Sequence, residues 1–195
     1  MASVLVPLAQ GCEELEAVTI IDLLRRAGIE VVTAGLAPGA VTGSRGTVLV
    51  PDTTLDEAST RDYDMIVLPG GQPGATHLEQ DPRIRMLLKG QAAAGRYNAA
   101  ICAAPKVLAA AGLLDGKEAT GYPGALDPKN FPRVRITGRS VVRDGKIVTS
   151  RGPGTAMDFA LELIEILAGP EKREAVEKPL MRPTAAADAD VPRWG

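Results

Sequence analysis

The sequence predicts a doubly wound α/β sandwich, with a mostly parallel central sheet and helices on both of its faces. Short apolar runs, typical of buried strands, alternate along the chain with stretches whose apolar residues recur at helical spacing. The first strand, helix and strand follow one another within about 35 residues, which defines a βαβ unit with a right-handed crossover. No internal repeat and no long linker interrupts this alternation, so one domain is expected over residues 1–183.

The N-terminal unit begins with the apolar run Val4–Leu8, which predicts a buried strand that ends before Gly11. A helix follows, with acidic residues in its first turn, where negative charge is favourable. Its apolar positions recur at helical spacing and are Ala17, Val18, Ile21 and Leu24. Gly28 ends this helix, and the β-branched run Glu30–Ala34 predicts the second strand.

The middle of the chain contains a Gly/Pro-rich loop, a brief strand, a short helix or turn and a buried strand. These segments are, in order, Leu36–Gly46, Thr47–Val50, Thr54–Arg61 and Tyr63–Leu68. The buried strand ends in Pro69-Gly70-Gly71, where the backbone can turn tightly with free N–H groups. A helix is expected to begin at Asp81, because Pro82 is favoured at a first helical position.

The second half begins with the apolar run Tyr97–Ile101, of which Asn98–Ile101 is the central strand, followed by a turn at Cys102 and a helix over Ala103–Ala111. Three further strands and a helix are expected before the C-terminus. A strand at Lys117–Gly121 precedes a hairpin whose arms, Val134–Val142 and Lys146–Thr149, meet at an Asp-Gly turn. An amphipathic helix starts near Thr155, a charged helical turn covers Glu171–Lys178, and residues 184–195 are expected to form a flexible tail.

Composition excludes several classes of function. The net charge of −2 and the aromatic content of 3% give no basic patch and few stacking platforms for nucleic acid. No apolar run is long enough to span a membrane, and the N-terminus lacks the basic segment of a signal peptide. Two cysteines, Cys12 and Cys102, provide no disulfide framework, so a reducing, cytoplasmic location is expected. No His/Cys cluster has metal-ligand spacing, and no nucleotide-binding motif is present, so we expect no metal and no cofactor.

Cys102 is the strongest candidate for a reactive group. It lies between an apolar strand and a helix, with small residues, Ala100 and Ala104, two positions away on each side. This spacing is typical of a nucleophile elbow, whose strained turn leaves no room for larger neighbours. A helix N-terminus also favours the thiolate, which is the reactive form of cysteine. The alternative is a buried structural cysteine, which is the commoner role of a free thiol.

Three loops should converge at the carboxyl ends of the predicted strands: residues 11–16, residues 69–71 and the turn at Cys102. This arrangement would bring an early carboxyl group beside the thiol, where like-charge repulsion keeps it protonated and able to donate to sulfur. The residue pattern does not choose among Glu13, Glu14 and Glu16. The alternative role of each is that of a helix N-terminal acid.

Four motifs in order make a more specific signal: GCEELEAVTIIDLLRRAGI, YDMIVLPGG, AAICAAP and TSRGPGTAMDFAL. With them the chain resembles the ThiJ/PfpI superfamily, and within it the branch of the Parkinson disease protein deglycase and its bacterial homologues. The resemblance implies a flavodoxin-like fold, a homodimer and Cys102 as the nucleophile. It also implies Glu16 as the carboxyl partner, and oxyanion donors at the amides of Gly70, Gly71 and Ala103.

The resemblance also points to four further pocket residues, of which Arg26 and Arg45 would line the entrance and hold an anion. Arg151 would brace backbone carbonyls near the site, and Tyr122 stands where some members carry a histidine, which argues against a Cys–His mechanism. Each arginine can equally be an ordinary surface residue. His77, the one histidine, and Cys12 are expected to be structural, with a catalytic histidine and a second oxidisable thiol as the alternatives.

Three hypotheses for function follow. The first is an enzyme in which Cys102 attacks methylglyoxal or its early adduct on a protein, Glu16 moves the proton and a hydroxy acid such as lactate is released. The second is a redox sensor or stress chaperone whose Cys102 is oxidised to sulfinic acid. The third is a non-catalytic dimer with an incidental thiol. The expected partners are a second copy of the chain and small reactive carbonyls or glycated proteins, with no membrane and no stable nucleic-acid partner.

Overall fold

The computed structural model describes residues 1–182, and the predicted tail lies outside the described residues. The strands of the main sheet are β1 (Ser3–Leu8), β2 (Glu30–Gly35), β5 (Thr53–Thr54), β6 (Met65–Leu68), β7 (Tyr97–Ile101), β10 (Val141–Asp144) and β11 (Ile147–Ser150). The helices are α1 (Glu14–Arg26), α2 (Leu55–Ala58), α3 (Gln72–Gln80), α4 (Pro82–Ala93), α5 (Pro105–Ala110), α6 (Ala156–Ala168) and α7 (Pro170–Glu177). Two small two-stranded sheets pair β3 (Val41–Thr42) with β4 (Val48–Leu49) and β8 (Glu118–Ala119) with β9 (Arg135–Ile136).

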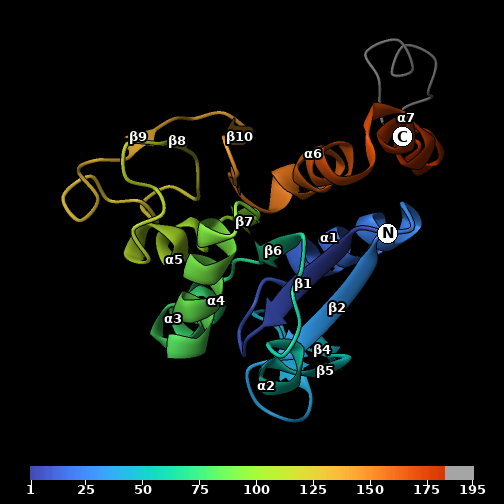
Figure 1. Ribbon diagram of the computed structural model, residues 1–195, viewed down its shortest axis with the longest axis horizontal. Coiled ribbons are helices and arrows are strands. Elements are labelled where there is room, and N and C mark those ends of the chain that lie inside the picture. Colours follow the sequence, from blue (N-terminus) through green and yellow to red (C-terminus); the bar gives the residue numbers. More distant parts are fainter. Residues whose placement is uncertain (183–195) are drawn as a thin grey trace, which may run out of the picture.

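The main sheet runs in the order β10-β11-β7-β6-β1-β2-β5, and only the β10–β11 pair is antiparallel within the described part of the chain. Figure 1 shows α1 and α6 together on one side of the strands and α3, α4 and α5 on the other. The doubly wound sandwich predicted from the sequence is therefore confirmed. The chain turns from one half of the sheet to the other between β1 and β6, which is where such folds place their sites.

Buried strands read as continuous apolar runs because helices cover both faces of a parallel sheet. All four residues of β6 are buried, and so are the last five of β1. In α1 the apolar stripe packs on the sheet and on α6, whose own buried face carries Phe159, the largest fully buried side chain. The core therefore follows the periodicities that predicted the elements.

Two parts of the sequence prediction were wrong. Residues 72–80, to which the sequence pattern assigns no element, form the helix α3, although they include two residues that usually break helices, Pro73 and Gly74. Pro73 lies in the first turn, where no amide is needed, and a Cβ at Gly74 would lie 2.7 Å from the backbone of Cys12. The predicted strand Val134–Val142 is instead divided, because β9 pairs with β8 and β10 joins the main sheet.

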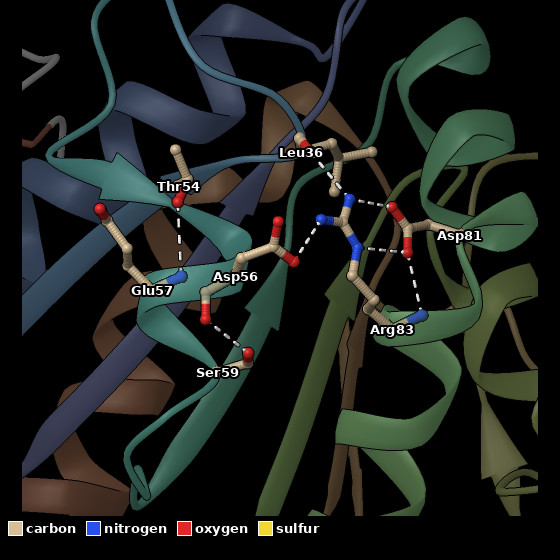
Figure 2. Close-up of polar contacts among 7 residues, drawn as sticks. All are labelled: Leu36, Thr54, Asp56, Glu57, Ser59, Asp81 and Arg83. Carbon is tan, nitrogen blue, oxygen red and sulfur yellow. Dashed lines mark hydrogen bonds and ion pairs between the residues drawn. The ribbon is translucent and has the colours of Figure 1, made fainter.

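A cluster of hydrogen bonds and ion pairs around Arg83 joins the start of α4 to α2 and to the segment after β2 (Figure 2). The guanidinium of Arg83 donates to the carbonyl oxygen of Leu36 at 2.8 Å and pairs with Asp56 of α2 and with Asp81. Asp81 also caps α4 by accepting from the amide of Arg83. One half-buried arginine thus joins α2, the start of α4 and the segment after β2. None of the helices in residues 1–182 is long and apolar enough to cross a membrane.

Candidate active site

The turn at Cys102 has the strained geometry that the sequence predicts. Cys102 follows β7 with a φ of 61°, a left-handed conformation that side chains other than glycine rarely adopt. Its amide donates to the carbonyl oxygen of Ser150 at 3.0 Å, and its carbonyl oxygen accepts from the amide of Tyr122 at 2.7 Å. The flanking backbone is therefore fixed by two neighbouring segments, and the thiol is held in one direction at the end of the central strand.

The register of the sheet brings the second loop to the thiol. Leu68 of β6 pairs with Ala100 of β7, so the residues two positions further along each chain, Gly70 and Cys102, lie side by side. A Cβ placed on Gly70 would lie 2.6 Å from the Cβ of Cys102 and 2.6 Å from Oε2 of Glu16. Only glycine fits between the thiol and the carboxyl group.

Glu16 is the carboxyl group that reaches the thiol. Its side chain is fully buried, Oε2 accepts from the amide of Gly70 at 2.8 Å, and the carboxyl group lies near enough to the Cys102 thiol for each group to shift the pKa of the other. Oε1 has no nitrogen or oxygen partner within the described residues. A buried carboxylate oxygen without a donor is costly, so Oε1 is the natural position for a proton that is shared with sulfur.

The helical spacing of α1 contains a signal that identifies Glu16. Glu16 lies four residues before Ile20 and eight before Leu24, and all three are buried on the same face of α1. A charged residue in register with an apolar stripe points into the protein rather than into solvent. Glu14, two residues before Glu16, and Glu13, the N-cap residue of α1, are only partly buried.

The amide donors are divided between two acceptors. The amides of Gly71 and Ala103 act on the sulfur of Cys102 and lower its pKa, whereas the amide of Gly70 donates to Oε2 of Glu16 at 2.8 Å. The assignment of Gly70 as an oxyanion donor is therefore corrected, because its one N–H already points at a carboxylate. Gly71 adopts a φ of 86°, and a Cβ there would lie 2.4 Å from the carbonyl oxygen of Gly11, so this donor also requires glycine.

Burial sets the proton affinities of the pair. Burial raises the pKa of Glu16 to about 7, although the Gly70 amide and the Cys102 thiol lower it. Burial and the negative charge of Glu16 raise the pKa of Cys102 to about 12, against the hydrogen bonds from Gly71 and Ala103, which lower it. The charge on Glu16 disappears when its carboxyl group holds the proton, and the same group then donates to sulfur. The two residues therefore behave as one acid pair.

This result corrects one expectation. A helix N-terminus alone does not make Cys102 a thiolate, because α5 begins only at Pro105 and burial raises the pKa of the thiol. The thiolate depends instead on the proton that Glu16 can hold and on the amides of Gly71 and Ala103.

A pocket of about 520 Å³ opens above the thiol. Cys102, which is 7% exposed, lies on its floor with Ala103 and Gly71. The remaining lining residues are Glu13, Ser44, Arg45, Gln72, Pro73, Tyr122, Pro123, Gly124, Ala125 and Pro153. A small electrophile can therefore reach the sulfur, while Glu16 lies beneath the floor and out of solvent.

The structure brings some of the other predicted residues to this pocket and not others. Arg45 and Tyr122 line it, and the Tyr122 side chain is more than half exposed. Arg26 does not: it lies in the last turn of α1 and pairs with Asp22 at 2.7 Å. The guanidinium of Arg151 makes no hydrogen bond within residues 1–182, so the predicted bracing of carbonyls is not found.

The remaining two candidates from the sequence lie outside the pocket lining. Nδ1 of His77 lies 2.8 Å from the carbonyl oxygen of Gln10 and holds the loop after β1. Cys12 is buried, and burial raises its pKa to about 11. No group of three or more histidine, cysteine or carboxylate side chains able to hold a metal ion is found in the part of the chain that the structure describes.

Comparison with known proteins decides the family. Residues 2–166 match the model of the DJ-1/PfpI family. The chain belongs to the DJ-1/PfpI family. It is 44% identical over 180 residues to protein dj-1beta of Drosophila melanogaster, covering 92% of this chain and 96% of that protein. The crystal structure of Drosophila melanogaster DJ-1beta superposes with a TM-score of 0.89 and covers 94% of this chain and 99% of that one.

Two further relatives carry names that bear on chemistry. The glutathione-independent glyoxalase DJR-1.2 of Caenorhabditis elegans is 37% identical over 179 residues, which cover 92% of this chain and 95% of that protein. A structure named as oxidized Toxoplasma gondii DJ-1 has a TM-score of 0.89 at 40% identity, and covers 94% of this chain and all of that one. The family and its α/β fold are thus established for this chain.

Gly70→Ala is expected to disrupt the site more than the fold. Since the added Cβ would lie 2.6 Å from both Cys102 and Glu16, the alkylation rate of Cys102 by iodoacetamide should fall by about tenfold or more. The free energy of unfolding should fall by about 1–3 kcal/mol. Gly90→Ala is the matched control, because a Cβ there would meet nothing within 4 Å. An unchanged alkylation rate in Gly70→Ala would show that the thiol and the carboxyl group are not in contact.

Proposed function

We propose that the protein is a cysteine-dependent enzyme that acts on small reactive carbonyl compounds, converting methylglyoxal or its early protein adducts to a hydroxy acid without glutathione. One observation carries this proposal. The Cys102 thiol lines an open pocket together with Gly71 and Ala103, whose amides lower its pKa, and a protonatable carboxyl group, Glu16, lies beside it across Gly70. A nucleophile, a proton carrier and oxyanion donors are the groups that addition to a carbonyl requires.

The reaction would begin with attack of the Cys102 thiolate on the aldehyde carbon of methylglyoxal. The new C–S bond converts the carbonyl oxygen to an alkoxide, which the amides of Gly71 and Ala103 stabilise and which takes the proton of Glu16. The product of this step is a hemithioacetal. Glu16, now a carboxylate, is the base within reach of the new adduct.

The second stage moves hydrogen from one carbon to its neighbour. Removal of the proton from the former aldehyde carbon gives an enediol, and return of a proton to the adjacent carbon gives a thioester of lactate. Water then hydrolyses the thioester, releasing lactate and the free thiol. One methylglyoxal and one water are consumed for each lactate, with no net oxidation, so no cofactor is needed.

The proposal extends to a homodimer in a reducing, cytoplasmic compartment. An apolar face on the surface of the monomer supports the dimer. Exposed Val18 of α1 and exposed Val50, the residue after β4, line one shallow hollow, and Leu15 of α1 and Val48 of β4 are exposed as well. Contiguous exposed apolar residues of this kind mark interaction surfaces. Sedimentation equilibrium should give the mass of two chains.

The two cysteines are both unpaired, which is consistent with a reducing compartment, where thiols stay reduced.

Redox sensing is a second candidate, favoured by the amides that face the sulfur. A sulfinate at Cys102 would present oxygens to the amides of Gly71 and Ala103 and to a protonated Glu16. Two oxygen atoms should then be gained at Cys102, and not at Cys12, after treatment with mild peroxide. Intact mass and peptide mapping measure this, and unselective oxidation of both thiols would reject the candidate.

Turnover distinguishes the enzyme from a protein that only traps carbonyls. Incubation with methylglyoxal in glutathione-free buffer should give many lactates for each Cys102, detected by proton NMR. Lactate formed in deuterium oxide should carry deuterium at its second carbon, because the migrating proton passes through the exchangeable carboxyl group of Glu16. Consumption that stops after one methylglyoxal for each thiol, with no lactate, would reject the proposed enzyme.

A further inference from the structure

A short turn between β3 and β4, residues 43–47, forms part of the rim of the Cys102 pocket. Ser44 and Arg45 of this turn line the pocket, although both are far from Cys102 in sequence. The two strands that carry the turn have only two residues each, so their own pairing gives it little support. The turn must therefore be held by other groups.

Glu14 supplies most of the polar contacts that hold this turn. Its Oε1 accepts from the amide of Arg45 at 2.8 Å and from the amide of Thr47 at 3.3 Å, and Oε2 accepts from the hydroxyl of Ser44 at 3.1 Å. A Cβ at Gly43 would lie 2.7 Å from the carboxyl carbon of Glu14, so the turn closes tightly around this group. The amide of Ser44 adds one contact by donating to the carbonyl oxygen of Cys12.

These contacts go beyond the role of a helix N-terminal acid. Burial raises the pKa of Glu14, but hydrogen bonds from its own amide and from Arg45 and Thr47 outweigh it and lower the pKa to about 2. The carboxylate therefore stays ionised and keeps its donors at any pH at which the protein works. Glu171, in the first turn of α7, is a helix N-terminal acid for which no hydrogen bond or ion pair is found among residues 1–182.

Arg45 is the functional group that the turn presents. Arg45 lines the pocket, its guanidinium forms no ion pair with a carboxylate of the described residues, and its Nη1 donates only to the carbonyl oxygen of Ser44 at 3.3 Å. Glu13, on the same rim, shares the one hydroxyl proton of Ser44 with Glu14, and its Oε2 lies 2.8 Å from the hydroxyl oxygen. A cation without a carboxylate partner at the mouth of a pocket is available to an anionic group of an incoming molecule.

We infer that Glu14 is a positioning residue that holds the rim turn so that Arg45 favours molecules with an anionic group at Cys102. Glu14 acts through the backbone of Arg45 and makes no contact with the reacting atoms. The inference concerns the selectivity of the thiol towards any electrophile. Its extension to carboxylated or phosphorylated carbonyl substrates rests on the proposed function.

The direction in which loss of Glu14 changes the rate of anionic electrophiles distinguishes this positioning role from direct repulsion by the charge of Glu14. Removing the negative charge of Glu14 would by Coulomb's law alone speed the approach of an anion to Cys102. Release of the turn has the opposite consequence, because Arg45 then leaves the pocket mouth and its attraction is lost. Loss of Glu14 should therefore slow anionic electrophiles relative to neutral ones.

Iodoacetate and iodoacetamide form a matched pair of probes, because they have nearly the same size and differ in charge. The quantity to measure is the ratio of their rates with Cys102 at pH 8, in the full-length protein, followed by mass spectrometry. Arg45→Met should lower the iodoacetate-to-iodoacetamide ratio by roughly threefold. Glu14→Ala should lower it to a similar extent, and the double variant should show no further decrease.

Two more variants complete the experiment. Glu14→Gln, whose amide oxygen still accepts hydrogen bonds, should give an intermediate ratio, and it carries the test if Glu14→Ala fails to fold. Glu171→Gln removes a helix N-terminal charge elsewhere and should leave the ratio unchanged. A ratio that is unchanged or higher in the Glu14 variants, or unchanged in Arg45→Met, would overturn the inference. Lactate formation does not enter this test, so its outcome is independent of whether the proposed enzyme turns over methylglyoxal.

Discussion

Replacing Cys102 with alanine is expected to reduce lactate formation from methylglyoxal by roughly 10³-fold or more. The sulfur is the one group at the pocket floor that can form a covalent bond to the carbonyl carbon, while Glu16 lies beneath it and the remaining contacts are backbone amides. Without the thiol, the carboxyl group and the amides can polarise a carbonyl but cannot form the hemithioacetal. A coupled lactate assay under pseudo-first-order conditions measures the loss.

Cys12→Ala is the matched control, because Cys12 is the other free thiol and does not line the pocket. It should retain turnover, and both variants should keep the far-ultraviolet circular dichroism of the parent. Alanine at position 102 must adopt the same φ of 61° as cysteine, so the backbone strain is similar in the two proteins. Full turnover by Cys102→Ala would disprove the nucleophilic role.

Glu16→Gln is expected to stabilise the protein at neutral and alkaline pH relative to the parent. The pKa of Glu16 is raised from an ordinary value of 4.5 to about 7, so the folded state holds a proton that the unfolded chain releases between these values. The parent therefore loses stability as pH rises from about 4.5 to about 7. The loss amounts to roughly 3 kcal/mol, because each pKa unit is worth about 1.4 kcal/mol. A glutamine at position 16 is neutral at every pH, so the Glu16→Gln variant does not lose this stability.

Urea unfolding at several pH values measures this difference. The gap in free energy of unfolding between Glu16→Gln and the parent should be smallest near pH 4 and should widen until about pH 8. Glu171→Gln, at an exposed position, serves as the control and should show no such pH dependence. A gap that is constant with pH would mean that folding leaves the pKa of Glu16 at its ordinary value of 4.5.

Much of the fold follows from the sequence, because buried parallel strands are apolar runs and the glycines after them mark the edge where loops meet. That edge brings the β6 and β7 loops together, since the register fixes Gly70 beside Cys102 once the strands pair in parallel. The helix α3 could not be predicted from the sequence, because its stability depends on close packing of Gly74 against the backbone of Cys12. No local pattern within residues 72–80 reveals that contact.

The site was predictable in its residue types but not in its hydrogen bonds. The turn at Cys102 follows from the strand-to-helix spacing, and a carboxyl group beside it follows from the convergence of three loops at the strand ends. The use of the Gly70 amide by Glu16 depends instead on where one N–H points. The pKa of the Cys102 thiol could not be predicted from the sequence either. Burial and the charge of Glu16 raise this pKa by more than the neighbouring backbone amides lower it. The contacts of Glu14 join segments about 30 residues apart, and no motif records them.

The central claim is that Cys102 and Glu16 share a proton, and the pH dependence of Cys102 alkylation by iodoacetamide tests it most directly. In the parent the rate should rise with a midpoint near pH 7, because loss of one proton from the pair lets the remaining proton lie on Glu16 while the sulfur is a thiolate. In Glu16→Gln the midpoint should move to higher pH, since burial still raises the pKa of the thiol and no carboxyl group holds the proton. Identical midpoints in the two proteins, or a parent that reacts only at or above the ordinary cysteine pKa of 9.0, would contradict the account.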